Sequence, residues 1–184
     1  MARLALQALD LSDGSTIGVR TAEEPDAAAW VDLIRALDGS DPPFATQADE
    51  RDLDLERRAR SVRARAEAPA DLLLLALLGP RVVGYVDFQA HRLRRMAHVG
   101  WFHMGVHPEA QRRGIGSALL RALVQWARAN PAIEKVCLGM FSTNAPGLVL
   151  YRKAGFAEEG RRVGEFKLGP GRYVDNVEMF LRVK

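Results

Sequence analysis

Met104-Gly-Val-His-Pro-Glu-Ala-Gln-Arg-Arg-Gly-Ile-Gly-Ser-Ala-Leu-Leu120 is the stretch of sequence that is most informative about the fold. His107-Pro108 predicts the end of a strand, because proline has no N–H to donate to a sheet. Beyond the turn, apolar residues recur every four positions, at Ile115, Leu119, Leu123 and Ala127. This spacing marks one face of a helix. The stretch therefore predicts a strand, a short basic turn and an apolar helix.

The turn itself carries two arginines and two glycines, in Arg112-Arg113-Gly114-Ile115-Gly116. A helix begins with unpaired N–H groups and a partial positive charge, and glycines let the backbone approach a ligand closely. The turn therefore predicts a phosphate site, and the alternative is an ordinary helix start with solvated arginines. The turn lacks the lysine of a Walker A loop and the third glycine of a dinucleotide-binding fingerprint.

Length and composition favour one globular domain. The chain has 184 residues, of which 48% are hydrophobic and 27% are charged, which is enough for a full core. A net charge of +3 does not indicate a nucleic-acid partner. The single cysteine, Cys137, predicts a buried thiol in a reduced, cytoplasmic setting. The apolar run 72–78 is too short to span a membrane, so we expect no membrane partner.

Hydrophobic patterning and turn residues predict the other elements. Strands are expected at 3–11, 15–20, 71–78, 81–89, 97–107, 134–141, 156–168 and 172–183, and helices at 25–37, 54–67, 115–129 and 144–154. The arginines of helix 54–67 are expected to form a solvated face. This order predicts an α/β (α+β) fold, with a mixed, mostly antiparallel central sheet and helices on both faces.

Two segments carry a family resemblance. Gln111-Arg-Arg-Gly-Ile-Gly116, entered through Val106-His-Pro108, resembles the Q/R-x-x-G-x-G/A pyrophosphate loop of the GNAT superfamily, the acyl-CoA-dependent N-acetyltransferases. Asn144-Ala-Pro-Gly-Leu-Val-Leu-Tyr-Arg-Lys-Ala-Gly-Phe156 resembles the N-x-x-A-x-x-x-Y-x-x-x-G-F segment of that family. The expected order of elements is also similar to GNAT along nearly the whole chain. The resemblance implies a single N-acetyltransferase domain over 1–184, with 1–12 as an extra N-terminal strand.

The resemblance also implies roles for these residues toward acetyl-CoA. The pantetheine arm would lie on Met104, Gly105 and Val106, and the pyrophosphate on Gln111, Arg112, Arg113, Gly114, Ile115, Gly116 and Ser117. Asn144 would contact coenzyme A, and Tyr151 would protonate the departing thiolate. A phenol of pKa about 10 can donate a hydrogen bond, and then its proton, to a thiolate whose conjugate acid has a pKa of about 8.5. The residues alone favour a helix cap for Asn144 and a core position for Tyr151.

The general base is harder to place. Many GNAT members carry a glutamate on the strand before the loop, but 96–107 has no Asp or Glu. His103 is the candidate, because the ordinary histidine pKa of about 6.5 suits the task. A packed His103, a water chain and a distant carboxylate such as Asp175 are the alternatives. We expect no metal, because strand alternation separates His98 from His103 and no carboxylate or cysteine completes a ligand set.

The sequence therefore predicts an enzyme that moves an acetyl group from acetyl-CoA directly to a primary amine of a small molecule. The alternatives are acetylation of a protein N-terminus, and an inactive coenzyme A-binding module, which the missing strand carboxylate would explain. We expect the acceptor pocket in the 39–53 loop, helix 54–67 and the 168–176 hairpin. The candidate acceptor-binding residues are Phe44, Trp101, Tyr173 and Asp175. A homodimer is compatible with the sequence.

Overall fold

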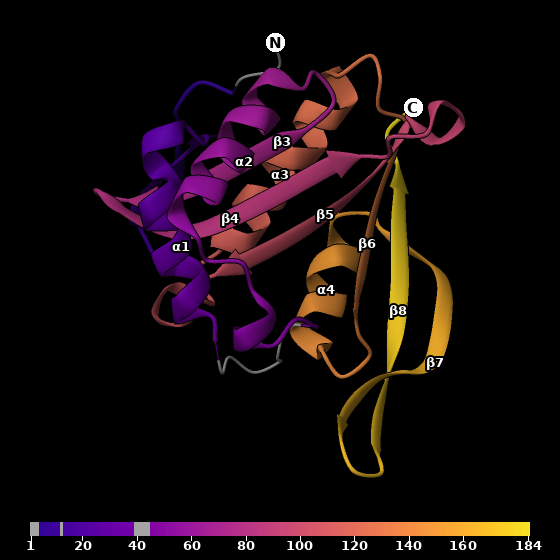
Figure 1. Cartoon of the computed structure of the whole chain (residues 1–184). Helices are drawn as coiled ribbons and strands as arrows, with labels where there is room; N and C mark the ends of the chain where they lie inside the picture. The colour runs from indigo at the N-terminus through magenta and orange to yellow at the C-terminus, as the bar shows by residue number, and fades with distance from the viewer. Residues whose placement is uncertain (1–3, 12, 39–44) are drawn as a thin grey trace.

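The structure is a computed structural model that describes residues 4–11, 13–38 and 45–184 (Figure 1). The strands are β1 (Gln7–Asp10), β2 (Thr16–Thr21), β3 (Leu72–Leu78), β4 (Arg81–Ala90), β5 (Val99–Val106), β6 (Lys135–Phe141), β7 (Ala157–Gly169) and β8 (Arg172–Arg182). The α-helices are α1 (Ala27–Ala36), α2 (Leu55–Glu67), α3 (Ile115–Ala129) and α4 (Ala145–Lys153). These strands form one sheet in the order β1-β2-β3-β4-β5-β6-β8-β7, which confirms the predicted fold class.

Burial explains the position of each strand in the sheet. The leucine-rich β3 lies third in the order, and its first five residues are buried, because an inner strand covered on both faces is apolar throughout. The edge strands β1 and β7 instead carry mostly exposed residues. The hairpin predicted over 3–11 and 15–20 is present as β1 and β2.

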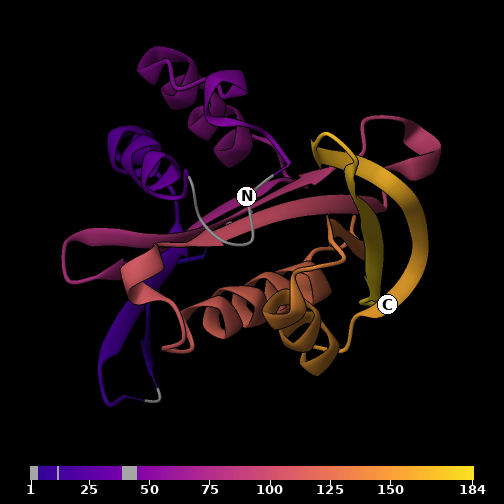
Figure 2. The same cartoon turned by 90° about the horizontal axis from the view of Figure 1, so that it is seen from below.

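The helices form two layers on opposite faces of the sheet. Figure 2 shows α1 and α2 on one face and α3 and α4 on the other. The larger core cluster contains Leu119 and Leu123 of α3 together with Phe102 of β5. The smaller cluster contains Trp30 of α1 together with Leu73 of β3. We call these two sides of the sheet the α3–α4 face and the α1–α2 face.

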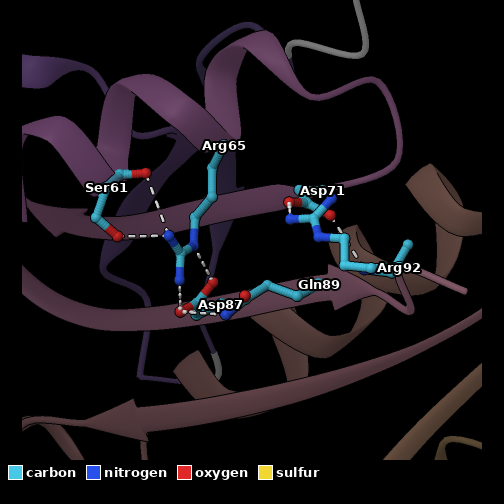
Figure 3. Close-up of polar contacts among 7 residues, drawn as sticks. Ser61, Arg65, Asp71, Asp87, Gln89 and Arg92 are labelled. Carbon is cyan, nitrogen blue, oxygen red and sulfur yellow. Dashed lines mark hydrogen bonds and ion pairs between the residues drawn. The ribbon is translucent and has the colours of Figure 1, made fainter.

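Helix α2 is fixed to the sheet by polar contacts rather than by an apolar stripe. Of its thirteen residues, all of them described, only Val62 is buried. The Arg65 Nη2 donates to Asp87 Oδ2 of β4 at 2.8 Å, and its Nε donates to Oδ1. Ser61 and Gln89 complete this cluster (Figure 3). The prediction of a solvated arginine face is therefore wrong for Arg65, whose side chain is only 14% exposed.

Strands β5 and β6 make the only parallel pair in the described sheet, and they separate soon after it begins. They pair at Val99–Trp101 of β5 with Lys135–Cys137 of β6. Beyond this point β5 continues to Val106 and pairs with β4, while β6 continues to Phe141 and pairs with β8. Figure 1 shows the two strands fanning apart. The sheet is therefore open in its middle.

Candidate active site

A cleft of about 620 Å³ occupies the opening between β5 and β6. Its walls come from both strands, from the loop before α3, from α4 and from the β7–β8 hairpin. The lining includes Trp101, Phe102, His103, Met104, Gly105, Val106, Gln111, Arg112, Gly114, Ile115, Gly116, Ser117, Gly139, Asn144 and Tyr151. The structure therefore brings together most of the residues that the sequence predicted for the site.

The loop before α3 presents free backbone N–H groups to one end of this cleft. Gly114 caps α3 with φ +93°, a left-handed conformation in which a side chain is strained. The first bond within the helix runs from the Ala118 N–H to the Gly114 carbonyl, at 3.0 Å. The N–H groups of Ile115, Gly116 and Ser117 therefore precede the helical bonding pattern, and all three residues line the cleft. This arrangement suits an anion such as a pyrophosphate.

The two arginines of the loop point to different places. Arg112 has φ +60° and lines the cleft. Arg113 instead reaches the β1–β2 turn, where its Nε donates to Asp13 Oδ2 at 2.6 Å and its Nη2 donates to Ser15 Oγ at 2.9 Å. Hydrogen bonds from Ser15 and then from Arg113 lower the pKa of Asp13 to about 2. The Arg113 side chain therefore anchors the loop, and Arg112 is the arginine available to a ligand.

The end of β5 offers further backbone groups to the opening. The His107 N–H donates to the Val83 carbonyl across the β4–β5 pair, at 2.8 Å. Backbone groups of alternate strand residues point in opposite directions, so the N–H and C=O groups of Met104 and Val106 point away from β4. From that side the Gln111 amide donates to the Val106 carbonyl, at 3.1 Å. An extended amide-containing ligand can therefore pair with β5 where β6 has diverged.

Helix α4 contributes two of the predicted residues. The Asn144 Oδ1 accepts from the Gly147 N–H at 2.9 Å, which is the helix cap that the residues alone predicted. Tyr151 is 8% exposed, and its ring packs edge-on against Phe102 and Phe156. Burial raises the pKa of the Tyr151 phenol above its ordinary value, so the hydroxyl stays protonated and can donate a proton or a hydrogen bond.

Successive side chains of β5 point alternately into the core and toward the open side of the cleft. Phe102 faces Tyr151 on the α3–α4 face, so Trp101 and His103 point to the α1–α2 face. Trp101 is 36% exposed, and both side chains line the cleft. An acceptor that enters from the α1–α2 face therefore meets Trp101 and His103 first.

Cys137 of β6 also lies on this face, but burial raises the pKa of its thiol to about 11, so it stays an unreactive thiol as the sequence predicted.

Two other predicted acceptor-binding residues, Tyr173 and Asp175, lie away from the cleft lining. Tyr173 is 59% exposed near the hairpin end. Asp175 accepts from the Gly164 N–H at 2.8 Å and from Arg161 at 3.3 Å, which lowers the pKa of its carboxyl and stabilises the irregular part of β7. Phe44 lies outside the described residues. Neither Tyr173 nor Asp175 is among the described residues that line the cleft.

The β7–β8 hairpin reaches the cleft through residues that sequence reasoning missed. Phe166 and Asn176 both line it, and Phe166 packs edge-on against Phe141, with ring centroids 4.4 Å apart. A usable signal was present in β8. Because Val177 and Met179 are the apolar, core-facing positions, alternation places Asn176 on the opposite face.

Comparison with known proteins agrees with this geometry. Residues 30–156 match the model of the acetyltransferase (GNAT) family, which is well over half of the chain. The protein therefore belongs to the GNAT family and is an acetyltransferase. Among the described residues, no helix is long and apolar enough to cross a bilayer.

Individual relatives extend this assignment. The chain is 32% identical to the L-amino acid N-acetyltransferase AaaT of Escherichia coli strain K12 over 119 residues, which cover 65% of this chain and 72% of that relative. It is similar to a GNAT-family acetyltransferase from Streptococcus pneumoniae, with 25% identity, TM-score 0.85 and coverage of 91% and 99% of the two chains. The fold also matches yncA, a putative acetyltransferase from Salmonella typhimurium solved with acetyl-CoA, with 24% identity, TM-score 0.79 and coverage of 91% and 94%.

Proposed function

We propose that this enzyme transfers the acetyl group of acetyl-CoA to the primary amine of a small molecule, with an L-amino acid as the first candidate acceptor. One observation carries the proposal: the cleft between β5 and β6 ends at the free N–H groups of the first turn of α3. That end suits the pyrophosphate, and the backbone of Met104 and Val106 suits the amides of the pantetheine arm. The L-amino acid acceptor is suggested by the name of the E. coli relative.

In the proposed reaction, the amine nitrogen attacks the thioester carbonyl carbon and forms a tetrahedral intermediate. The C–S bond then breaks, the acetyl group stays on nitrogen, and the nitrogen loses its extra proton, which balances the proton that the thiolate gains. Backbone N–H groups of β5 that face the opening can stabilise the oxyanion. Tyr151 gives its proton to the departing thiolate, because the raised pKa keeps the phenol protonated until the thiolate forms.

The substrate ammonium must lose a proton before attack. We propose His103 for this step, because its exposed side chain lies on the side of the cleft from which an acceptor enters. The carboxylate alternative, Asp175, is held by Arg161 and Gly164 in the hairpin. The buried Asp87 of β4 is opposite His103 in the strand register, but Arg65 already occupies both of its oxygens.

The proposal is tested by measuring thiol release from acetyl-CoA with a panel of acceptors. The panel contains the twenty L-amino acids, simple alkylamines and peptides with free N-termini, and mass spectrometry identifies the acetylated product. We expect N-acetylated amino acid with release of one thiol for each acetyl group transferred. Release with peptides alone would favour the protein N-terminal alternative. Absence of transfer to every acceptor, with coenzyme A still bound, would favour the inactive module.

A further inference from the structure

Gly139 interrupts a buried part of β6. The strand's burial pattern shows residues 136–138 and 140–141 buried and Gly139 exposed. Gly139 lies on the α1–α2 face, because its neighbours Leu138 and Met140 pack into the core on the other face. A glycine within a strand often marks a place where a ligand or another chain segment approaches the backbone closely. Here the exposed backbone forms part of the cleft wall.

The side chain of Asn176 lies beside this bare backbone. Asn176 is on β8, two residues from the position that pairs with Gly139, so the two residues share a face of the sheet, and Asn176 also lines the cleft. Its Oδ1 is buried and has no hydrogen-bond partner among the described residues. A buried polar atom without a partner is costly in free energy. Such an atom in the wall of an active-site cleft indicates that a ligand supplies the missing partner.

Gly139 allows the Asn176 carboxamide to lie close against β6. A Cβ atom built at Gly139 would lie 3.0 Å from Asn176 Oδ1 and 3.3 Å from Nδ2. Both distances are shorter than ordinary van der Waals contacts of a carbon atom, so a side chain at position 139 would displace the carboxamide. The glycine therefore holds open the place that the Asn176 side chain takes in the cleft wall.

The Asn176 side chain lies on the same face of the sheet as the proposed base. Trp101 of β5 pairs with Cys137 of β6 where the two strands are still in contact. Two residues further along each strand, His103 and Gly139 take corresponding positions on the two sides of the opening. Both positions lie on the α1–α2 face, so an amine in the opening would lie between Asn176 and the strand that carries His103.

We propose that Gly139 and Asn176 form the subsite for the acceptor amine, an inference that rests on the proposed function. The absent side chain of Gly139 leaves room for the Asn176 carboxamide, and Asn176 Oδ1 accepts one N–H group of the amine. A neutral primary amine has two N–H groups and one lone pair. Holding one N–H at Asn176 directs the lone pair toward the thioester in the opening, and Asn176 is thus an acceptor-binding residue.

Asn176→Leu tests the subsite, because leucine keeps the approximate size of the side chain and removes its polarity. The assay uses the L-amino acid that gives the fastest thiol release with the wild-type enzyme. We expect the KM for this acceptor to rise about tenfold, the effect of one lost hydrogen bond, while the KM for acetyl-CoA stays unchanged. We also expect the Tm to equal or exceed that of the wild type, because the variant removes an unpaired buried atom.

Gly139→Ala tests the same subsite from the other strand, since its Cβ would lie 3.0 Å from Oδ1 and would displace the carboxamide. It should raise the acceptor KM in the same direction. Gly160→Ala is the matched control, because this glycine is also in a strand and its Cβ would meet nothing within 4 Å. It should leave both KM values unchanged.

The outcomes separate the subsite from the proposed function. An unchanged acceptor KM in Asn176→Leu would overturn the subsite and leave the acetyltransferase reaction intact. A lowered Tm with both KM values raised would show that Asn176 is structural and would also overturn it. Failure of the wild type to bind acetyl-CoA would instead refute the proposed function itself.

Discussion

At the scale of single residues, Tyr151 is held in place by its neighbours. The rings of Phe102 and Phe156 lie 5.9 and 6.0 Å from its ring, which fixes the phenol at the cleft wall. Burial keeps the phenol protonated. A side chain placed in this way can donate a proton repeatedly without losing its position.

The first prediction concerns Tyr151→Phe. This variant keeps the ring packing and removes the hydroxyl, so we expect kcat to fall about a hundredfold, as for the loss of a general acid. The Kd for coenzyme A should stay unchanged. Steady-state thiol release and calorimetric titration measure the two quantities. A kcat equal to that of the wild type would remove Tyr151 from the mechanism.

Residue types and spacing predicted some roles and missed others. The Asn144 cap could be predicted, because an asparagine before a short helix caps it from local sequence alone. The anchoring of Arg113 by Asp13 could not, because the two residues are far apart in sequence and meet only after folding. Asp175 and Asn176 are adjacent in β8 and point to opposite sides. Alternation with Val177 and Met179 could separate the two, but that β8 borders the cleft at Asn176 appears only in the folded sheet.

At the scale of elements, α2 depends on its inward-facing arginine. The sequence showed a helix with acidic residues first and arginines later, which predicts its bounds but not which arginine is buried. Arg65 meets Asp87, a carboxylate on a strand that sequence reasoning treated only as a sheet element. Pairing between a helix and a strand is a tertiary event that no local pattern reports.

We predict different costs for two arginine substitutions on α2. Arg65→Ala leaves the buried Asp87 carboxylate unpaired, and it should lower the free energy of unfolding by about 3 kcal/mol. Arg60→Ala removes an exposed pair with Glu56 and should cost less than about 0.5 kcal/mol. Urea unfolding of both variants measures the difference. Equal losses would show that the Arg65–Asp87 pair does not anchor the helix.

At the scale of the whole molecule, three buried weak acids make the stability of the fold depend on pH in the alkaline range. Burial, and then the Asp87 charge, raises the pKa of Tyr85 to about 12. Burial also raises the pKa values of Tyr151 and Cys137. These groups hold their protons in the folded state to higher pH than in the unfolded chain. Their contribution to stability is therefore present below the unfolded pKa values and is lost as the pH rises toward the folded ones.

The corresponding prediction is a fall in the urea midpoint as the pH rises from about 9 to about 12. Tyr85 alone accounts for roughly 2–3 kcal/mol across this range, since each pKa unit corresponds to about 1.4 kcal/mol. Tyr85→Phe keeps the ring and removes the ionisable group, so its midpoint should fall less steeply. A wild-type midpoint that stays constant up to about pH 11 would contradict this linkage.

The overall architecture could largely be predicted, whereas the opening of the sheet could not. Alternating patterns and turn residues predicted the strands and helices in their order, because these signals are local. The separation of β5 from β6 depends on where the parallel pairing ends, at Trp101 and Cys137. Neither strand carries a proline or charge at that point, so the sequence does not mark it. The cleft that defines the site therefore appears only in the folded chain.

The most direct test of the coenzyme A site is calorimetric titration of coenzyme A into the wild type, Gly114→Asp and Gly171→Asp. Both glycines have positive φ, +93° and +69°, so both variants carry backbone strain and a new charge, but Gly171 lies in the turn between β7 and β8. We predict that the wild type and Gly171→Asp bind coenzyme A with the same Kd and that Gly114→Asp shows no binding. Wild-type affinity in Gly114→Asp would contradict the assignment of the β5–β6 cleft as the coenzyme A site.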